Sequence, residues 1–129
     1  PVIELDANLL FGPMRHRVSP DHFASLDRIA QTIASTRYPV MIEGHTDAIP
    51  ARGKYSNFYL SAARAAAVQE YLEHAAGLGP GLVTAVGMGA ANPHPDAKSP
   101  RDARHRRVEI VFEIQDRSNK PYVLPEARP

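Results

Sequence analysis

Two short segments of this sequence carry side chains that are suited to holding a small charged ligand. The segment 44–47 (Gly-His-Thr-Asp) ends in the carboxylate of Asp47, and a second segment, which begins at Asn57, carries the guanidinium group of Arg64. A carboxylate accepts hydrogen bonds from an ammonium group, and the planar arginine fork matches a carboxylate through two parallel hydrogen bonds. Asp47 and Arg64 therefore suggest a site for a zwitterion that is gripped by one charge at each end.

Both charged residues also have purely structural interpretations. An aspartate that opens a loop after a predicted strand, as Asp47 does, often accepts hydrogen bonds from its own backbone in an Asx-turn. Arg64 lies beside an apolar helical stripe that starts at Leu60, where an arginine can extend its stem over apolar neighbours. The two charges can also pair with each other. Asn57 lies two predicted helical turns before Arg64, on nearly the same face, so both can point toward one place.

His45 is open to three interpretations: a catalytic base, a metal ligand, or a histidine that hydrogen-bonds a backbone carbonyl and holds a loop. The 6 histidines include no His-x-x-x-His pair, so the sequence predicts no metal site and no other cofactor. The chain also lacks cysteine and a Gly-x-Ser-x-Gly nucleophile elbow. The segment 87–89 (Gly-Met-Gly) lacks the third glycine of a dinucleotide motif and predicts a tight turn.

Four arginines in the C-terminal half form the only basic cluster of the sequence: Arg101, Arg104, Arg106 and Arg107. Such a cluster either docks an anionic polymer or lies on a solvated loop. Over the whole chain 15 basic residues are offset by 14 acidic ones, and the formal net charge of +1 argues against a nucleic-acid partner. Because side chains alternate along a strand, Arg106 and Arg107 are expected to face opposite ways, so at most one faces the Asp47 site.

The hydrophobic pattern predicts the elements that position these residues. The chain of 129 residues is 43% hydrophobic and fits one domain. Strands are predicted over 2–5, 39–43, 82–86 and 108–114, helices from 19–21 onward and over about 58–74, and an apolar turn over 9–11 that Gly12-Pro13 closes. In the second helix the predicted apolar stripe comprises Leu60, Ala63, Ala67, Val68, Tyr71, Leu72 and Ala75. This order predicts an α/β (α+β) fold with two main helices on one face of a mixed sheet of about four strands.

The ends of the chain lead to two further expectations. Three prolines after residue 115 (Pro121, Pro125 and Pro129) predict an extended or disordered tail over 116–129, behind a domain over 1–115. No apolar run approaches the roughly 20 residues of a membrane span. Because the sequence opens directly on a strand pattern, we interpret it as a fragment or a processed product, which leaves room for a targeting or membrane segment upstream.

The motifs resemble those of the OmpA-like peptidoglycan-binding domain over roughly residues 3–114. Residues 57–68 fit the family pattern Asn-x-x-Leu-Ser-x-x-Arg-Ala-x-x-Val without a gap, and they follow the family's Gly-His-Thr-Asp segment. Two further matches are the segment 86–89 with Pro93, and the segment 106–110 (Arg-Arg-Val-Glu-Ile). Ile49-Pro50, the longer loop that follows and the segment 9–11 look most like the periplasmic branch of flagellar stator (MotB) proteins.

The resemblance implies a non-catalytic domain with a βαβαβ sandwich fold that binds meso-diaminopimelate in the peptidoglycan stem peptide. Asp47 and Arg64 would be the principal ligands, within a pocket completed by Thr46, Asn57, Leu60 and Arg106. For the stator branch it further implies a homodimer that anchors the flagellar motor to the cell wall. The domain would be the periplasmic part of an inner-membrane protein and would join a MotA-type channel partner through a membrane helix outside this sequence.

Two alternatives and two departures from the family pattern accompany this interpretation. Within the family, the alternative is an outer-membrane or secretion-system wall tether; from another class, it is a cell-wall hydrolase with His45 and Asp47 as acid and base. His105 stands where the family usually has asparagine, and Arg101-Asp102 stands where it has Gly-Arg. Both departures concern the second wall of the pocket and the role of Arg106.

Overall fold

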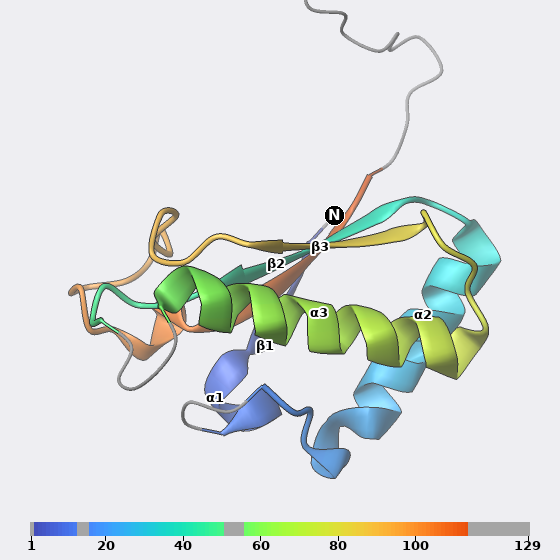
Figure 1. The fold of residues 1–129 in the computed structure, drawn as a ribbon, viewed down its shortest axis with the longest axis horizontal. Coiled ribbons are helices and arrows are strands. Elements are labelled where there is room, and N and C mark those ends of the chain that lie inside the picture. The colour runs from blue at the N-terminus through green and yellow to red at the C-terminus, as the bar shows by residue number, and fades with distance from the viewer. Residues whose placement is uncertain (1, 13–15, 51–55, 114–129) are drawn as a thin grey trace, which may run out of the picture.

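The structure, a computed structural model, describes residues 2–12, 16–50 and 56–113. The strands are β1 (Val2–Asp6), β2 (Val40–His45), β3 (Val83–Gly87) and β4 (Arg107–Phe112), and the α-helices are α1 (Ala7–Phe11), α2 (Phe23–Thr36) and α3 (Asn57–Ala76) (Figure 1). Two short 3-10 helices, Pro20–His22 and Ala103–His105, precede α2 and β4. The predicted α/β fold, with two main helices on a four-stranded mixed sheet, is confirmed.

The sheet has the strand order β1-β4-β2-β3. β4 pairs antiparallel with both β1 and β2, whereas β2 and β3 run parallel and are connected through α3. Ile42 of β2 lies beside Ile110 of β4 in the buried layer. The next residues along the strands, Glu43 and Glu109, are also direct neighbours and point to the opposite face of the sheet.

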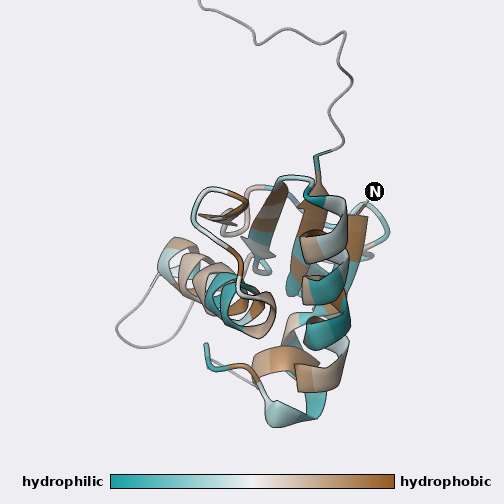
Figure 2. Ribbon diagram, turned by 90° about the vertical axis from the view of Figure 1, so that its right-hand side faces the viewer, coloured by the Kyte–Doolittle hydropathy of each residue, from teal (hydrophilic) through white to brown (hydrophobic). Residues whose placement is uncertain are grey.

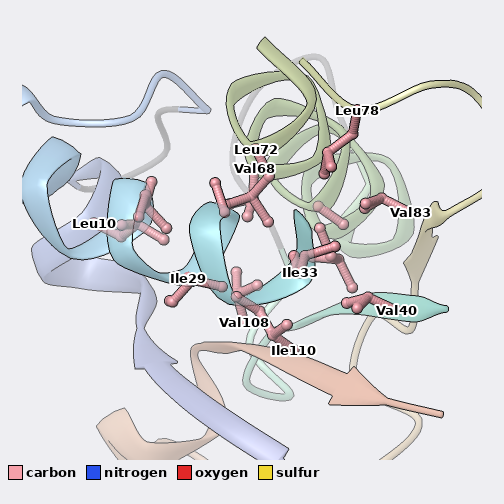
Figure 3. Packing of buried hydrophobic residues seen from close by; sticks show 14 of the residues in the cluster. Leu10, Ile29, Ile33, Val40, Val68, Leu72, Leu78, Val83, Val108 and Ile110 are labelled. Carbon is pink, nitrogen blue, oxygen red and sulfur yellow. The ribbon is translucent and has the colours of Figure 1, made fainter. Parts of the chain in front are cut away.

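The core lies between the sheet and the helices. Leu26, Ile29, Ala30 and Ile33 recur at helical spacing on α2 and are buried. Figure 3 shows Ile29 and Ile33 close to Val108 and Ile110 of β4. Burying one such aliphatic side chain stabilises the fold by about 1.5–3 kcal/mol. The polar side chains of α2 remain outward, and Figure 2 shows hydrophilic and hydrophobic stretches alternating along its turns.

The predicted helix start at Ser19-Pro20-Asp21 is confirmed, although its first turn is a 3-10 helix. Ser19 caps that turn, because its hydroxyl oxygen accepts a hydrogen bond from the backbone N–H of Asp21. Pro20 occupies the first helical position, where its missing N–H costs nothing.

The apolar segment 9–11 is helical, so the prediction of a turn was wrong. The carboxylate of Asp6 accepts hydrogen bonds from the backbone N–H groups of Asn8 and Leu9, at 2.8 and 3.3 Å, and so caps the short helix α1. Gly12 ends α1 with a φ of 81°, a value that glycine adopts without strain. α1 buries Leu10 and Phe11 and places Asn8 at the edge of the sheet near β4.

α3 lies unusually close to the sheet in its N-terminal half. A Cβ atom added to Gly44 of β2 would meet the backbone oxygen of Ser61, and one added to Gly87 of β3 would meet Ala62. Small side chains and bare backbone therefore face each other here. The predicted apolar stripe was partly wrong: Ala65 is buried, whereas Ala75 is exposed.

The strand and helix bounds shift slightly from those predicted. β2 extends to His45, and β3 extends to Gly87. α3 begins after its N-cap Ser56 and ends at Ala76, before its C-cap Gly77. The predicted end of the last strand at residue 114 and the predicted tail over 116–129 lie outside the described residues. Among the described helices, none combines the length and the apolar character that crossing a membrane requires.

Candidate functional site

The predicted site residues meet at one edge of the sheet. β2 and β3 run parallel, so both end at this edge, and Asp47 follows the last residue of β2 by two positions. β4 is antiparallel to β2, so its first residues lie at the same edge, with Arg106 just before it. α3 begins above this edge, as Figure 1 shows, and carries Asn57 and Arg64 in its first turns.

Asp47 uses both oxygens of its carboxylate. Oδ1 accepts a hydrogen bond from the backbone N–H of Ile49 at 3.0 Å, which is the Asx-turn that the sequence suggested. Oδ2 forms an ion pair with Nη1 of Arg106 at 2.5 Å. Asp47 is only 8% exposed, so its carboxylate is largely shielded from water. The Asx-turn therefore fixes the carboxylate in place and leaves one oxygen directed at a cation.

Arg106 reaches Asp47 from the entry of β4. Its Nε donates a hydrogen bond to the side-chain oxygen of Asn8, on α1, at 3.1 Å. Arg107 contacts another set of groups, among them the carboxylate of Glu109 and the backbone oxygen of Asn92. The prediction that the two arginines face opposite ways, with at most one at the site, is therefore confirmed.

Arg64 is buried, which is contrary to the interpretation of a surface arginine. It is 4% exposed, its Nη2 donates a hydrogen bond to the backbone oxygen of Gly12 at 3.1 Å, and its guanidinium carbon lies 5.3 Å from the ring centre of Phe11. Burial lowers the pKa of Arg64, and the neighbouring positive charge of Arg106 lowers it further. The guanidinium groups of Arg64 and Arg106 are therefore close enough to repel each other.

The other predicted pocket residues support the loop that follows β2. Asn57 donates from its side-chain nitrogen to the backbone oxygens of Ile49, at 3.0 Å, and Asp47, at 3.5 Å. Thr46 is buried, and its backbone N–H donates to the oxygen of Gly89 at 2.8 Å. Leu60 is buried one helical turn before Arg64. These residues position Asp47 relative to α3 and to the loop after β3.

Comparison with known proteins identifies the family. The family model described as "OmpA family" matches residues 10–107. The chain belongs to the OmpA family. No curated protein sequence matches the chain significantly.

The solved structures that resemble this OmpA-family domain come from several wall-associated systems. The periplasmic domain of Helicobacter pylori MotB superposes with a TM-score of 0.75 at 27% identity, over 89% of this chain and 76% of that chain. A putative MotB-like protein from Desulfovibrio vulgaris gives 0.76 at 29% identity, over 92% and 76%. The cell wall anchor of the type VI secretion system from Pseudomonas aeruginosa gives 0.73 at 33% identity, over 86% and 80%.

The family and these neighbours define the broad function of the chain. It is a non-enzymatic peptidoglycan-binding domain of the OmpA type, and the neighbours indicate a periplasmic location. The alternative of a cell-wall hydrolase is therefore not supported. Within the described residues, the side chains of His45 and Asp47 also contact different groups: His45 lies between Glu43 and Glu109, whereas Asp47 contacts Arg106 and the backbone of Ile49.

One interpretation of His45 was that it hydrogen-bonds a backbone carbonyl. In this OmpA-family domain, its Nε2 contacts two carboxylates instead. Nε2 lies 3.2 Å from a carboxylate oxygen of Glu43 and 3.1 Å from one of Glu109. Burial lowers the pKa of His45, and the charge of Arg107 lowers it further, while the two carboxylates partly offset both effects. His45 therefore ties β2 to β4 on the face of the sheet that is opposite to the helices.

The two departures from the family pattern stabilise the loop before β4. His105 is buried; its Nδ1 accepts a hydrogen bond from the backbone N–H of His94, and its Nε2 lies 2.8 Å from the backbone oxygen of Ser99. The carboxylate of Asp102 accepts from the backbone N–H groups of Lys98 and Arg104, and these two bonds lower the pKa of Asp102. Arg106 retains a fixed approach to Asp47 despite the unusual residues before it.

Sequence reasoning missed the contribution of α1 to the site. Asn8 orients Arg106, Phe11 lies against Arg64, and the backbone oxygen of Gly12 accepts from Arg64. The signal was an aspartate at position 6 directly before an apolar segment, which is typical of a helix N-cap. A cavity of about 440 Å³ on another side of Thr46 also went unpredicted; its lining includes Ala48, Pro93, Ala97 and Pro100.

Proposed function

We propose that Asp47 and Arg64 bind the diaminopimelate residue of a peptidoglycan stem peptide, and that the domain thereby anchors a flagellar motor stator to the cell wall. The observation that carries this proposal is the burial of opposite charges at one sheet edge: Asp47 is 8% exposed and Arg64 is 4% exposed. Burying a charge costs folding free energy, and a domain retains such charges mainly where they serve a ligand or a specific contact.

Binding proceeds by an exchange of partners at Asp47. The ligand ammonium replaces Arg106 at Oδ2 of Asp47, while Oδ1 keeps its bond to the backbone of Ile49. The ligand carboxylate binds the guanidinium of Arg64, which suits it through two parallel hydrogen bonds. Arg106 is 29% exposed at its side chain, so it can leave Asp47 without becoming buried elsewhere. The released Arg106 then provides a second cation for the ligand carboxylates.

The remaining predicted pocket residues act through the shape of the site. Thr46, Asn57 and Leu60 hold the loop and the first turns of α3 in register, as their contacts and burial indicate. The cavity beside Thr46 has room for further residues of the stem peptide. One stem peptide binds weakly, and firm anchoring comes from several domains acting on one polymer, which raises the effective concentration of each site.

The stator assignment is supported by the likeness to the MotB periplasmic domains, which extends over about nine tenths of the chain. On this proposal, residues 1–115 form the domain and residues 116–129 form a tail. Two copies of the chain associate as a homodimer. It belongs to an inner-membrane protein that meets a MotA-type channel partner through an upstream membrane helix. The likeness to the type VI secretion anchor, at 33% identity, favours a secretion-system tether as the second candidate. The upstream sequence separates the two, because a stator requires a membrane helix that bears an acidic residue.

A co-sedimentation experiment with purified peptidoglycan sacculi tests the wall-binding site. Asp47→Ala and Arg64→Ala are each expected to weaken binding by about 2–5 kcal/mol, because each leaves the opposite charge of the ligand unpaired. Arg28→Ala, on the exposed face of α2, removes a positive charge far from the site and serves as the matched control. Circular dichroism checks that each variant is folded. Unchanged binding by both folded site variants would refute the proposal.

A further inference from the structure

The open face of the sheet carries an acidic row that the wall-binding site does not use. Glu4 of β1 lies opposite Glu109 of β4, and Glu109 lies opposite Glu43 of β2, so three carboxylates line up across three neighbouring strands. The next position on β2 and β4 on this face pairs His45 with Arg107. Asp6 of β1 lies opposite Arg107, so the two rows hold four carboxylates and Arg107 as their one permanent cation, while His94 contacts Glu4 from outside the rows. The excess negative charge favours a cation as a further partner.

Glu43, His45 and Glu109 have the spacing of a metal-binding set. Nε2 of His45 is 3.2 Å from Oε1 of Glu43 and 3.1 Å from Oε2 of Glu109, and one ligand atom from each residue lies within 4.8 Å of the others. A tetrahedral zinc ion with bonds of about 2.0–2.1 Å separates its ligand atoms by about 3.3 Å. Small movements of the two carboxylates would therefore admit the ion.

The burial of the set is also typical of a metal centre. The side chain of His45 is 1% exposed, whereas those of Glu43 and Glu109 are 22% and 24% exposed, so the carboxylates lie between the imidazole and solvent. Nδ1 of His45 is buried and has no hydrogen-bond partner among the described residues. A metal ion on Nε2 would place the ring proton on this Nδ1, whose acceptor would then be water or a group outside the described residues.

We propose that Glu43, His45 and Glu109 bind one divalent transition-metal ion of the zinc class, with water in the fourth position. The imidazole nitrogen favours zinc over magnesium, and carboxylate oxygens are accepted ligands of zinc. Arg107 directs Nε and Nη2 at Oε2 of Glu109, both at 3.2 Å, and orients that carboxylate as an outer partner. The ion would join β2 to β4 immediately before the loop that carries Asp47.

Calorimetric titration of the full chain with Zn²⁺ alone tests this site. We expect one ion per chain at this site, and a loss of affinity of roughly tenfold or more in Glu43→Gln and in Glu109→Gln. Glu4→Gln is the matched control, because Glu4 belongs to the same acidic row but not to the proposed ligand set. The Zn²⁺ affinity of the control is expected to stay within about twofold of that of the unmodified chain. This change is smaller than the roughly tenfold loss that follows removal of an outer-shell partner.

Nitrogen NMR of the His45 ring provides a readout that does not depend on the variants being folded. Zn²⁺ is expected to shift the Nε2 resonance of His45 in the unmodified chain at the same concentrations that produce the calorimetric signal. If the His45 resonances stay unchanged, or if Glu4→Gln lowers the affinity as much as the ligand variants do, the zinc site is refuted. The cluster would then be a hydrogen-bonded link between strands.

Discussion

In the proposed binding site, the pair formed by Asp47 and Arg106 would determine which group a ligand must displace. An ammonium group that enters the site competes with a guanidinium that is already in place and is held by Asn8. A ligand that carries only an ammonium group gains one ion pair with Asp47 and breaks one, the pair between Asp47 and Arg106, so it gains little net binding energy. A ligand that also carries a carboxylate gains Arg64 and the released Arg106, so the site should discriminate in favour of amino acids with both groups.

Arg106→Gln tests this discrimination at the residue scale. Removing the guanidinium takes away about 1.5–3 kcal/mol of charge-assisted hydrogen bonding to the ligand carboxylate. It also removes the competitor for the ligand ammonium. We therefore expect the preference for diaminopimelate over cadaverine, which carries ammonium groups and no carboxylate, to fall by about tenfold, measured by NMR titration of the two free ligands.

Arg104→Gln is the matched control for Arg106→Gln. Arg104 is an exposed arginine of the same basic cluster, and its Nη1 donates to the backbone oxygen of Asp96. A similar loss of preference in both variants would show that only the overall charge matters, and that the exchange at Asp47 plays no part.

At the scale of the elements, the close approach of α3 to the sheet positions the site. Gly44 and Gly87 leave room for the backbone of α3 at Ser61 and Ala62. This contact lies between Asn57 and Arg64 on the helix, so any displacement of α3 would separate Arg64 from the loop that holds Asp47.

Gly44→Ala is expected to destabilise the fold through this contact. The added Cβ would clash with the backbone oxygen of Ser61, which cannot move without shifting α3. Overpacking of this kind costs about 1–3 kcal/mol. Urea unfolding measures the loss, and Gly79→Ala is the control, because nothing lies within 4 Å of its added Cβ. Equal stability of the two variants would contradict the tight packing.

Some elements of the fold can be predicted from the sequence, and others cannot. The Ser19-Pro20 helix start and the alternation that buries Val108 and Ile110 follow from local rules, and both are confirmed. The helix α1 was missed because five residues give too little periodicity, and only Asp6 signals it. The strand register, which brings Glu43 to Glu109 across the sheet, depends on the tertiary fold and leaves no local pattern.

The sequence indicates which residues belong to the candidate site, but it does not indicate the contacts and burial of their side chains. The sequence singled out Asp47 and Arg64, but it did not indicate that Arg106 occupies Asp47 or that Arg64 is buried. The surroundings of Arg64 depend on Phe11 and the backbone oxygen of Gly12, and the Arg106 contact depends on the pairing of β4 with β2. Both come from distant parts of the sequence, which a search for motifs does not see.

At the scale of the whole molecule, His45 links the stability of the sheet to pH. Its pKa in the folded chain is lowered, chiefly by burial, from an ordinary value of 6.5. The unfolded chain therefore binds a proton more readily, and the stability that neutral His45 provides is present above pH 6.5 and is lost as the pH falls through the lowered pKa.

His45→Gln tests this linkage, since glutamine keeps a hydrogen-bond donor near the two glutamates and does not titrate. Urea unfolding over the range from pH 7.5 to about 5 is expected to show a smaller loss of stability in His45→Gln than in the unmodified chain. His16→Gln, which changes an exposed histidine, is the control. An identical pH dependence in all three proteins would exclude His45 as the source.

The pairing of β1 with β4 has a mechanical consequence for a domain that holds on to a wall. Val2 pairs with Val111 at one end of the ladder, and Asp6 pairs with Arg107 at the other end, next to the wall-binding edge. Tension between that edge and the start of β1 would act lengthwise along the two strands. All the hydrogen bonds of the ladder would then share the load in shear, instead of opening one after another as in a zipper.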